Sequence, residues 1–274
     1  MDMRATAALI LAATLGMGAV GCDDDSTGPG PGGGPITAGP FDWQGDIAQG
    51  NHIEIKGVAG DIRVESSTGS QVEVAATRTG IDNDPNEVTL DVVTHGEGVT
   101  ICAVYPHPTG GTNSCVPGMG GDMSTGNNDV VVDFSVKVPD GVDFVGRVVA
   151  GSVEVLEIEG DIVAVVIAGE VNVSTSGVAE ATVTSGPIFA SMGSDSWDRG
   201  LAFGAAAGSI TVEVPATLDA EVEAATATGT ITSQFPITIT SVGAGATGAG
   251  QLGAGGHLLR LTTAAGDIAL NRRN

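Results

Sequence analysis

Residues 150–173 read AGSVEVLEIEGDIVAVVIAGEVNV, in which one phrase recurs: a small residue, Gly, a residue that is most often polar, then Ile or Val. The phrase returns around eight glycines along the chain, and seven of them follow Ala, Ser or Thr. These predicted turn glycines are Gly60, Gly151, Gly160, Gly169, Gly186, Gly208, Gly229 and Gly266. Because Ile and Val are common in this composition, the evidence lies in the small residue before each Gly and in the alternation after it.

After each of these glycines, apolar and polar residues alternate. Val153 and Val155 fall on one face, and Ser152 and Glu154 on the other. A period of two is typical of a β-strand with one buried face. Glycine suits the corners between such strands, because it accepts positive φ and lets neighbouring backbones approach closely.

The spacing of the phrase predicts the fold. Glycines between Gly151 and Gly186 follow one another at eight or nine residues, so two strand-and-turn units make a coil of about 18 residues. We therefore predict an all-β fold, a single-stranded, β-helix-like β-solenoid of short Gly-cornered strands. A β-sandwich is the competing fold, since regular short strands also build it, and antiparallel pairing would indicate it.

The first 40 residues indicate export. Residues 1–21 carry Arg4 and then an apolar run too short to span a bilayer comfortably, which predicts a signal peptide. The run ends Ala19-Val20-Gly21-Cys22, which resembles the lipobox of bacterial lipoproteins and predicts lipid on Cys22; an ordinary signal peptide with an incidental Cys is the alternative. Residues 22–40, rich in Asp, Gly and Pro, are expected to form a disordered tether.

Residues 41–274 are expected to form one β-strand-repeat domain with an insertion at about 80–130. Within the insertion, residues 88–93 and 99–104 predict a hairpin. Residues 240–256 are predicted to be a Gly/Ala-rich loop. Arg272 and Arg273 are expected at the last exposed edge, where charge discourages pairing with another chain.

Cysteine usage agrees with export. Apart from Cys22, the chain has two Cys, Cys102 and Cys115, which flank a Gly-containing loop. In an oxidising compartment they are expected to form a disulfide contributing about 3 kcal/mol on a chain-entropy estimate. The alternative is a metal site that uses both thiols with His95 or His107, although no CxxC or His pair at ligand spacing is present.

The formal net charge of −23 argues against binding nucleic acid or anionic lipid through a cationic surface.

Residues 53–270 resemble the bacterial putative-adhesin family of β-strand-repeat domains of unknown function. The resemblance rests on ICAVYP at 101–106, NDVVVDF at 128–134, AEVEA at 220–224 and GDIAL at 266–270. It implies an exported right-handed solenoid or related repeat fold with no established activity, and it transfers no catalytic residue.

A polysaccharide-active β-helix enzyme would need a cleft with paired carboxylates. The candidates Asp61, Glu154, Asp161 and Glu170 fall where any soluble solenoid places charge, and no GxSxG motif is present. We therefore expect no enzyme, no catalytic residue and no cofactor.

Two further segments offer binding alternatives. Residues 82–87 supply oxygen ligands but lack the central Gly of an EF-hand loop, so an Asx-rich turn is favoured over a calcium site, and no metal is expected. Trp197 could contact a sugar, but packing with Phe203 against the core is the favoured interpretation.

The sequence thus predicts an exported, lipid-anchored, non-catalytic protein that presents an extended surface for adhesion, envelope or protein interaction. The expected location is a bacterial cell-envelope membrane, facing the periplasm or the cell surface. The expected partners are the membrane, through the N-terminal lipid, and an envelope protein or glycan. A calcium- or glycan-binding module is the alternative function.

Overall fold

The computed structural model describes residues 35–121 and 124–273. The predicted signal peptide, Cys22 and most of the predicted tether therefore lie outside the described residues. In the described part, no helix has the length and apolar character to cross a membrane. The region is all-β, with one short 3-10 helix, η1 (Pro85–Glu87).

In residues 35–121 and 124–273, twenty-two strands form two large mixed sheets of eleven strands each. Sheet A contains, in spatial order, β1 (Ile36–Thr37), β5 (Val72–Gly80), β8 (Val131–Val138), β4 (Ile62–Ser66), β10 (Val153–Ile158), β12 (Val171–Thr175), β14 (Ile188–Met192), β16 (Ile210–Val214), β22 (Ile268–Arg272) and β18 (Ile231–Ser233), with β2 (Phe41–Gly45) paired to β5 beside this path. Sheet B contains β19 (Thr238–Val242), β20 (Gly245–Leu252), β17 (Ala220–Thr228), β21 (Leu258–Ala265), β15 (Leu201–Ala207), β13 (Ala179–Ser185), β11 (Ile162–Ala168), β9 (Asp143–Ala150), β3 (His52–Ala59), β7 (Gly98–Val104) and β6 (Thr89–His95).

The predicted alternation places the core between the two sheets. Val153 and Val155 of sheet A and Ile162 and Ala164 of sheet B are buried in one cluster with the other inward side chains. The next residue along each strand faces outward and is partly exposed. The inward faces of both sheets therefore share one apolar core.

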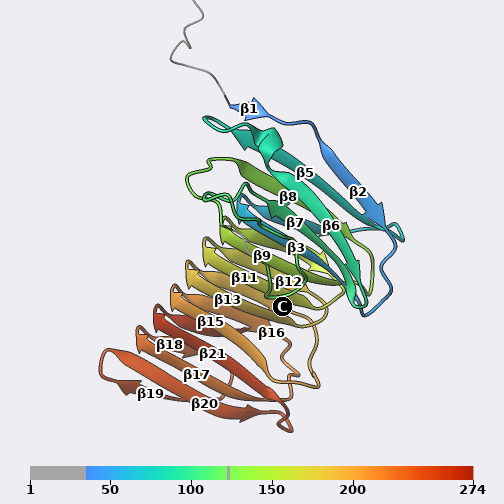
Figure 1. Cartoon of the computed structure of the whole chain (residues 1–274). Coiled ribbons are helices and arrows are strands. Elements are labelled where there is room, and N and C mark those ends of the chain that lie inside the picture. Colours follow the sequence, from blue (N-terminus) through green and yellow to red (C-terminus); the bar gives the residue numbers. More distant parts are fainter. Residues whose placement is uncertain (1–34, 122–123, 274) are drawn as a thin grey trace, which may run out of the picture. The chain divides into compact units, whose positions relative to one another are not determined.

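From β9 to β16 the chain alternates between the sheets, so that one circuit is a strand in sheet B followed by a strand in sheet A (Figure 1). Neighbouring circuits pair in parallel, and Val153 lies opposite Val171, 18 residues further along. The all-β prediction is thereby confirmed. A single-stranded solenoid for the whole region is not shown, because antiparallel pairs build the β1–β5–β8 end of sheet A and both ends of sheet B. Two facing mixed sheets are the layering of a β-sandwich.

The spatial order of the strands in each sheet differs from their order in the sequence. Strand β21 lies between the earlier strands β15 and β17 (Figure 1). Strand β22 likewise lies between β16 and β18. The expectation of Arg272 and Arg273 at an exposed edge is therefore wrong, since Arg272 pairs with Val214 and the Arg273 N–H donates to the Val214 carbonyl.

Of two further local predictions, the loop is wrong and the hairpin is confirmed. The segment 240–256, predicted as a loop, contains most of the hairpin β19–β20, because its β-branched and small residues support a strand pair without large apolar side chains. The hairpin predicted at 88–93 and 99–104 is confirmed by the antiparallel pair β6–β7. The described sheet begins with β1, before the expected domain start at residue 41.

Most of the recurring glycines stack above one another at one corner of successive circuits. On each, a Cβ would stand about 2 Å from a carbonyl oxygen of the neighbouring circuit, as for Gly169 at 1.9 Å from the Gly151 oxygen. This stack contains Gly60, Gly151, Gly169, Gly186, Gly208, Gly266 and Gly229, whereas Gly160 lies at a different corner, against the Val142 carbonyl.

The polar residue after the corner glycine links neighbouring circuits. The Asp61 carboxylate accepts the Ser152 N–H at 2.7 Å, and the Asp267 carboxylate accepts the Thr230 N–H at 2.7 Å. This hydrogen bond from the Thr230 backbone is the main reason that the pKa of Asp267 lies below its ordinary value.

Candidate functional site

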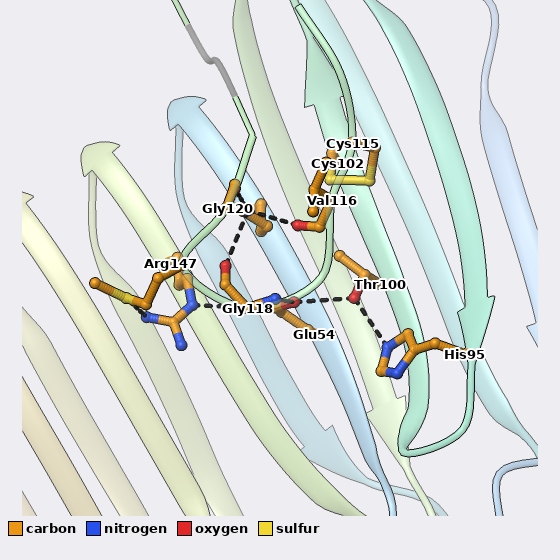
Figure 2. A network of polar contacts seen from close by, with 11 residues as sticks. Glu54, His95, Thr100, Cys102, Cys115, Val116, Gly118, Gly120 and Arg147 are labelled. Atoms are coloured by element: carbon orange, nitrogen blue, oxygen red, sulfur yellow. Dashed lines mark hydrogen bonds and ion pairs between the residues drawn. A yellow bond between two sulfur atoms is a disulfide. The ribbon is translucent and has the colours of Figure 1, made fainter.

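A loop between β7 and β8 lies over the outer face of sheet B, and a disulfide holds its first part. Cys102 of β7 is bonded to Cys115, so the predicted pairing is correct. With both sulfurs in the disulfide, the alternative of a metal site on two thiols is wrong. The loop continues through Val116 and Gly118 to Gly120 and passes above β3 and β9 (Figure 2).

Lys56 of β3 anchors this loop. Its ammonium group donates three hydrogen bonds, to the carbonyl oxygens of Val116, Gly118 and Gly120 at 2.9, 3.0 and 2.6 Å. An ammonium group has three N–H donors, so all of them are used. The Lys56 side chain therefore holds the loop to the sheet and has no donor left for a ligand.

Glu54, two residues earlier on the same face of β3, is buried beneath the loop and forms the centre of the network. Its side chain is only 1% exposed. It receives hydrogen bonds from Arg147 of β9 at 2.7 Å, from the Gly118 N–H at 2.8 Å and from the Thr100 hydroxyl at 2.9 Å. His95 of β6 continues the network through Thr100, with 3.1 Å between Nε2 and Oγ1 (Figure 2).

The register of the strands brings these residues together. Glu54 lies opposite Thr100, and Lys56 lies between Cys102 and Arg147 in the adjacent row. The disulfide and the Lys56 anchor thus share one row of the sheet. The polar cluster is built by register, which local sequence patterns do not reveal.

The electrostatics agree with a structural ion cluster. Burial raises the pKa of the Glu54 carboxyl, but the hydrogen bonds from Arg147, Gly118 and Thr100 outweigh it, so that this pKa lies below its ordinary value. Burial lowers the pKa of Lys56, and the nearby charge of Glu54 opposes that change. Both charged forms are held by direct partners, as buried charges require.

A cavity of about 240 Å³ opens beside the loop. Its lining includes Met119 and Arg147 together with the outward side chains Val149, Val165 and Ile167. Strand β11 is apolar on both faces, although one of its faces is turned outward. Ile167 is 49% exposed and Val149 is 38% exposed. We call the outward residues Val149, Val165 and Ile167, with Met119 beside them, the apolar patch.

Three of the four carboxylates considered for catalysis form separate contacts, and the fourth, Glu170, is exposed after the corner Gly169. Glu154 forms an ion pair with Arg63, and Asp161 forms one with Arg199 at 3.3 Å. Asp61 accepts the Ser152 N–H at the glycine corner. Each of these three carboxylates thus has a partner of its own.

The segment 82–87, for which calcium binding was the less favoured alternative, forms a turn held by hydrogen bonds to its backbone. Asp129 accepts the N–H groups of Ile81, Asp82 and Asn83, and Asp84 caps η1. Across residues 35–121 and 124–273, no group of three or more His, Cys, Asp or Glu is arranged to hold a metal ion. Trp197 packs against the core that contains Phe203, as the favoured interpretation has it.

No protein-family model and no curated protein matches the chain. Among solved structures, it is similar to one described as a putative cell adhesion protein from Clostridium sporogenes, with 13% identity, 86% of this chain and 100% of the other covered, and a TM-score of 0.42. A putative adhesin from Bacteroides fragilis has 12% identity, 85% and 97% coverage, and a TM-score of 0.28. A putative lipid binding protein from Parabacteroides distasonis has 12% identity, 86% and 97% coverage, and a TM-score of 0.20. At this level of similarity, no function transfers to the present chain.

Proposed function

We propose that the protein is an exported, non-catalytic interaction protein that binds another envelope component through the outer face of sheet B. In this proposal, Met119, Val149, Val165 and Ile167 form the contact surface, and the disulfide-held loop borders this surface on one side.

The exposed apolar patch carries this proposal. The chain has a formal charge of −23, and the outward positions of its sheets are largely polar, yet β9 and β11 turn apolar side chains outward at one place. Apolar patches with a polar rim are typical of protein contact sites. Arg147 and the loop held by Lys56 border the patch and are fixed by partly buried hydrogen bonds, so the surface is formed before a partner binds.

The separate contacts of Asp61, Glu154 and Asp161, three of the carboxylates considered for catalysis, support a non-catalytic role. The Cys102–Cys115 disulfide supports an oxidising compartment outside the cytosol. Lipid attachment at Cys22, on a tether that follows a cleaved signal peptide, completes the proposal and makes the membrane the second partner.

For the fold, the finer proposal is a two-strand solenoid over the circuits from β9 to β16, closed by antiparallel strands. It is supported by the parallel registers and the 18-residue repeat between Val153 and Val171. The glycine stack supports it as well, because close approach of identical corners is what a solenoid repeats.

The experiment is capture from envelope fractions by the immobilised full chain, with bound proteins and glycans measured. Ile167→Lys places a charge in the apolar patch and is expected to reduce specific capture about tenfold or more. Phe189→Lys is the matched control, because Phe189 is a 38% exposed apolar side chain on the outer face of sheet A. Equal capture by both variants, or capture of nothing specific by the native chain, contradicts the proposal.

A further inference from the structure

Strand β19 is an open edge of sheet B. It pairs with β20 on one side only, and all five of its residues are exposed. A two-residue turn joins Val242 to Gly245, so Val242 and Gly245 form a hydrogen-bonded pair. Along β19, hydrogen-bonded and non-hydrogen-bonded pairs then alternate. The N–H and C=O groups of Ile239 and Ser241 therefore point away from β20, toward an additional strand.

The other edges in the described part of the chain carry features that discourage pairing. Strand β6 contains Asp91, and the Cys115 sulfur lies 3.7 Å from the Asp91 carbonyl oxygen. Strand β18 has three residues, β1 has two, and β2 carries Asp42. Strand β19 reads TITSV, with no charge, no Pro and a length of five residues. Soluble proteins rarely leave such an edge unpaired.

Charge indicates which partner fits this edge. Residues 224–259 contain no Asp, Glu, Lys or Arg, in a chain whose formal charge is −23. Two copies of this chain repel each other over most of their surfaces. At β19 two copies can approach without opposing like charges, and identical strands complement each other about a twofold axis.

We propose that β19 is a self-association edge, at which a second copy of this chain pairs its own β19 antiparallel about a twofold axis. Sheet B then continues from one copy into the other. A five-residue strand pair buries much less than the roughly 800 Å² per partner of a stable interface, so the dimer is weak and depends on concentration. Salt strengthens it, because the remaining surfaces are both acidic.

The test is sedimentation equilibrium of the full chain over about a hundredfold range of concentration. The native chain is expected to dimerise, more strongly at high salt. Ser241→Pro removes one outward N–H from each copy, and it is expected to weaken the dimer about tenfold or more. Ser241→Ala keeps the N–H and is expected to dimerise like the native chain.

A second pair of variants guards against local damage by proline. Thr240 is the central residue of β19, so Thr240→Glu opposes two carboxylates at the twofold axis and is expected to abolish the dimer. Thr247→Glu puts the same charge opposite Thr240 on β20, one strand further from the axis, and is expected to weaken the dimer less. The thermal unfolding of each variant is measured alongside. A native chain that stays monomeric at every concentration overturns the proposal, as does a dimer that neither Ser241→Pro nor Thr240→Glu weakens.

Discussion

Gly169 lies directly against Gly151 of the neighbouring circuit: a Cβ on Gly169 would stand 1.9 Å from the Gly151 carbonyl oxygen. The φ angle of Gly169 is +150°, a conformation that residues with a side chain rarely adopt. Two independent reasons thus require glycine here, one steric and one conformational.

Gly169→Ala is therefore expected to destabilise the protein by more than about 3 kcal/mol, because the backbone of the next circuit must move. Urea unfolding measures the effect. Gly204→Ala is the matched control, since the nearest atom to its added Cβ, Thr262 Oγ1, is 3.9 Å away. That variant is expected to be as stable as the native protein or slightly more stable. Equal destabilisation by both changes would contradict the glycine-stack argument.

Lys56→Met is expected to release the loop, because three carbonyl oxygens lose their shared donor. The predicted cost is about 2 kcal/mol, and faster proteolysis within residues 116–121 is the readout. Lys137→Met serves as the control, because Lys137 is exposed and pairs with Glu73 at the surface. Native-like proteolysis of the Lys56 variant would show that the disulfide alone holds the loop.

Stability is expected to fall as the pH drops below about 4.5, the ordinary pKa of Glu54. The folded-state pKa values of Glu54, Asp129 and Asp267 are lowered, so the folded protein binds fewer protons than the unfolded chain. Their contribution is complete above the unfolded pKa and is lost as pH falls through the folded pKa. The raised pKa of Asp143 acts in the opposite direction.

Glu54→Gln tests the contribution of Glu54 to this expectation. It leaves Arg147 without its carboxylate and is expected to cost about 3 kcal/mol at pH 7, a difference that closes as the pH falls below 4.5. Urea unfolding from pH 7 to pH 3 gives the profile. Glu73→Gln, at an exposed pair, is expected to follow the native curve. A Glu54 variant whose deficit does not depend on pH would contradict the assignment.

Ending the chain at His257 is expected to do more than remove one circuit. It leaves β15 and β17 of sheet B, and β16 and β18 of sheet A, without the strands that join them. We expect loss of cooperative unfolding and a tendency to aggregate, measured by circular dichroism and light scattering. A synthetic peptide of residues 258–274 added in trans is expected to restore cooperative unfolding and to suppress aggregation. A truncated chain with native stability would contradict the observed strand order.

The glycine phrase was informative because local chemistry determines it. A strand whose alternate residues are Val153 and Val155 can bury only that face, and a corner where backbones nearly touch accepts only glycine. The hairpin β6–β7 and the disulfide were predictable for the same reason, since close neighbours in sequence form them.

Features set by strand order were not predictable. Nothing in the sequence around Arg272 indicates that β22 lies between β16 and β18, so this residue was expected at an edge. Glu54 and Lys56 alternate with buried isoleucines and resemble solvated residues, although the loop buries them. The one local signal was the pair Cys102 and Cys115, whose disulfide holds the first part of the loop to β7.

The placement of β21 and β22 sets the order in which the fold can be completed. Strands β21 and β22 are synthesised after the strands on both sides of them, and each must pair with both of these neighbours. The circuits up to β16 can pair as they are synthesised. Strands β17 and β18 cannot join them until β21 and β22 are available to pair between them. Residues 258–272 therefore complete both sheets, and the two sheets cannot be completed until this segment has been synthesised.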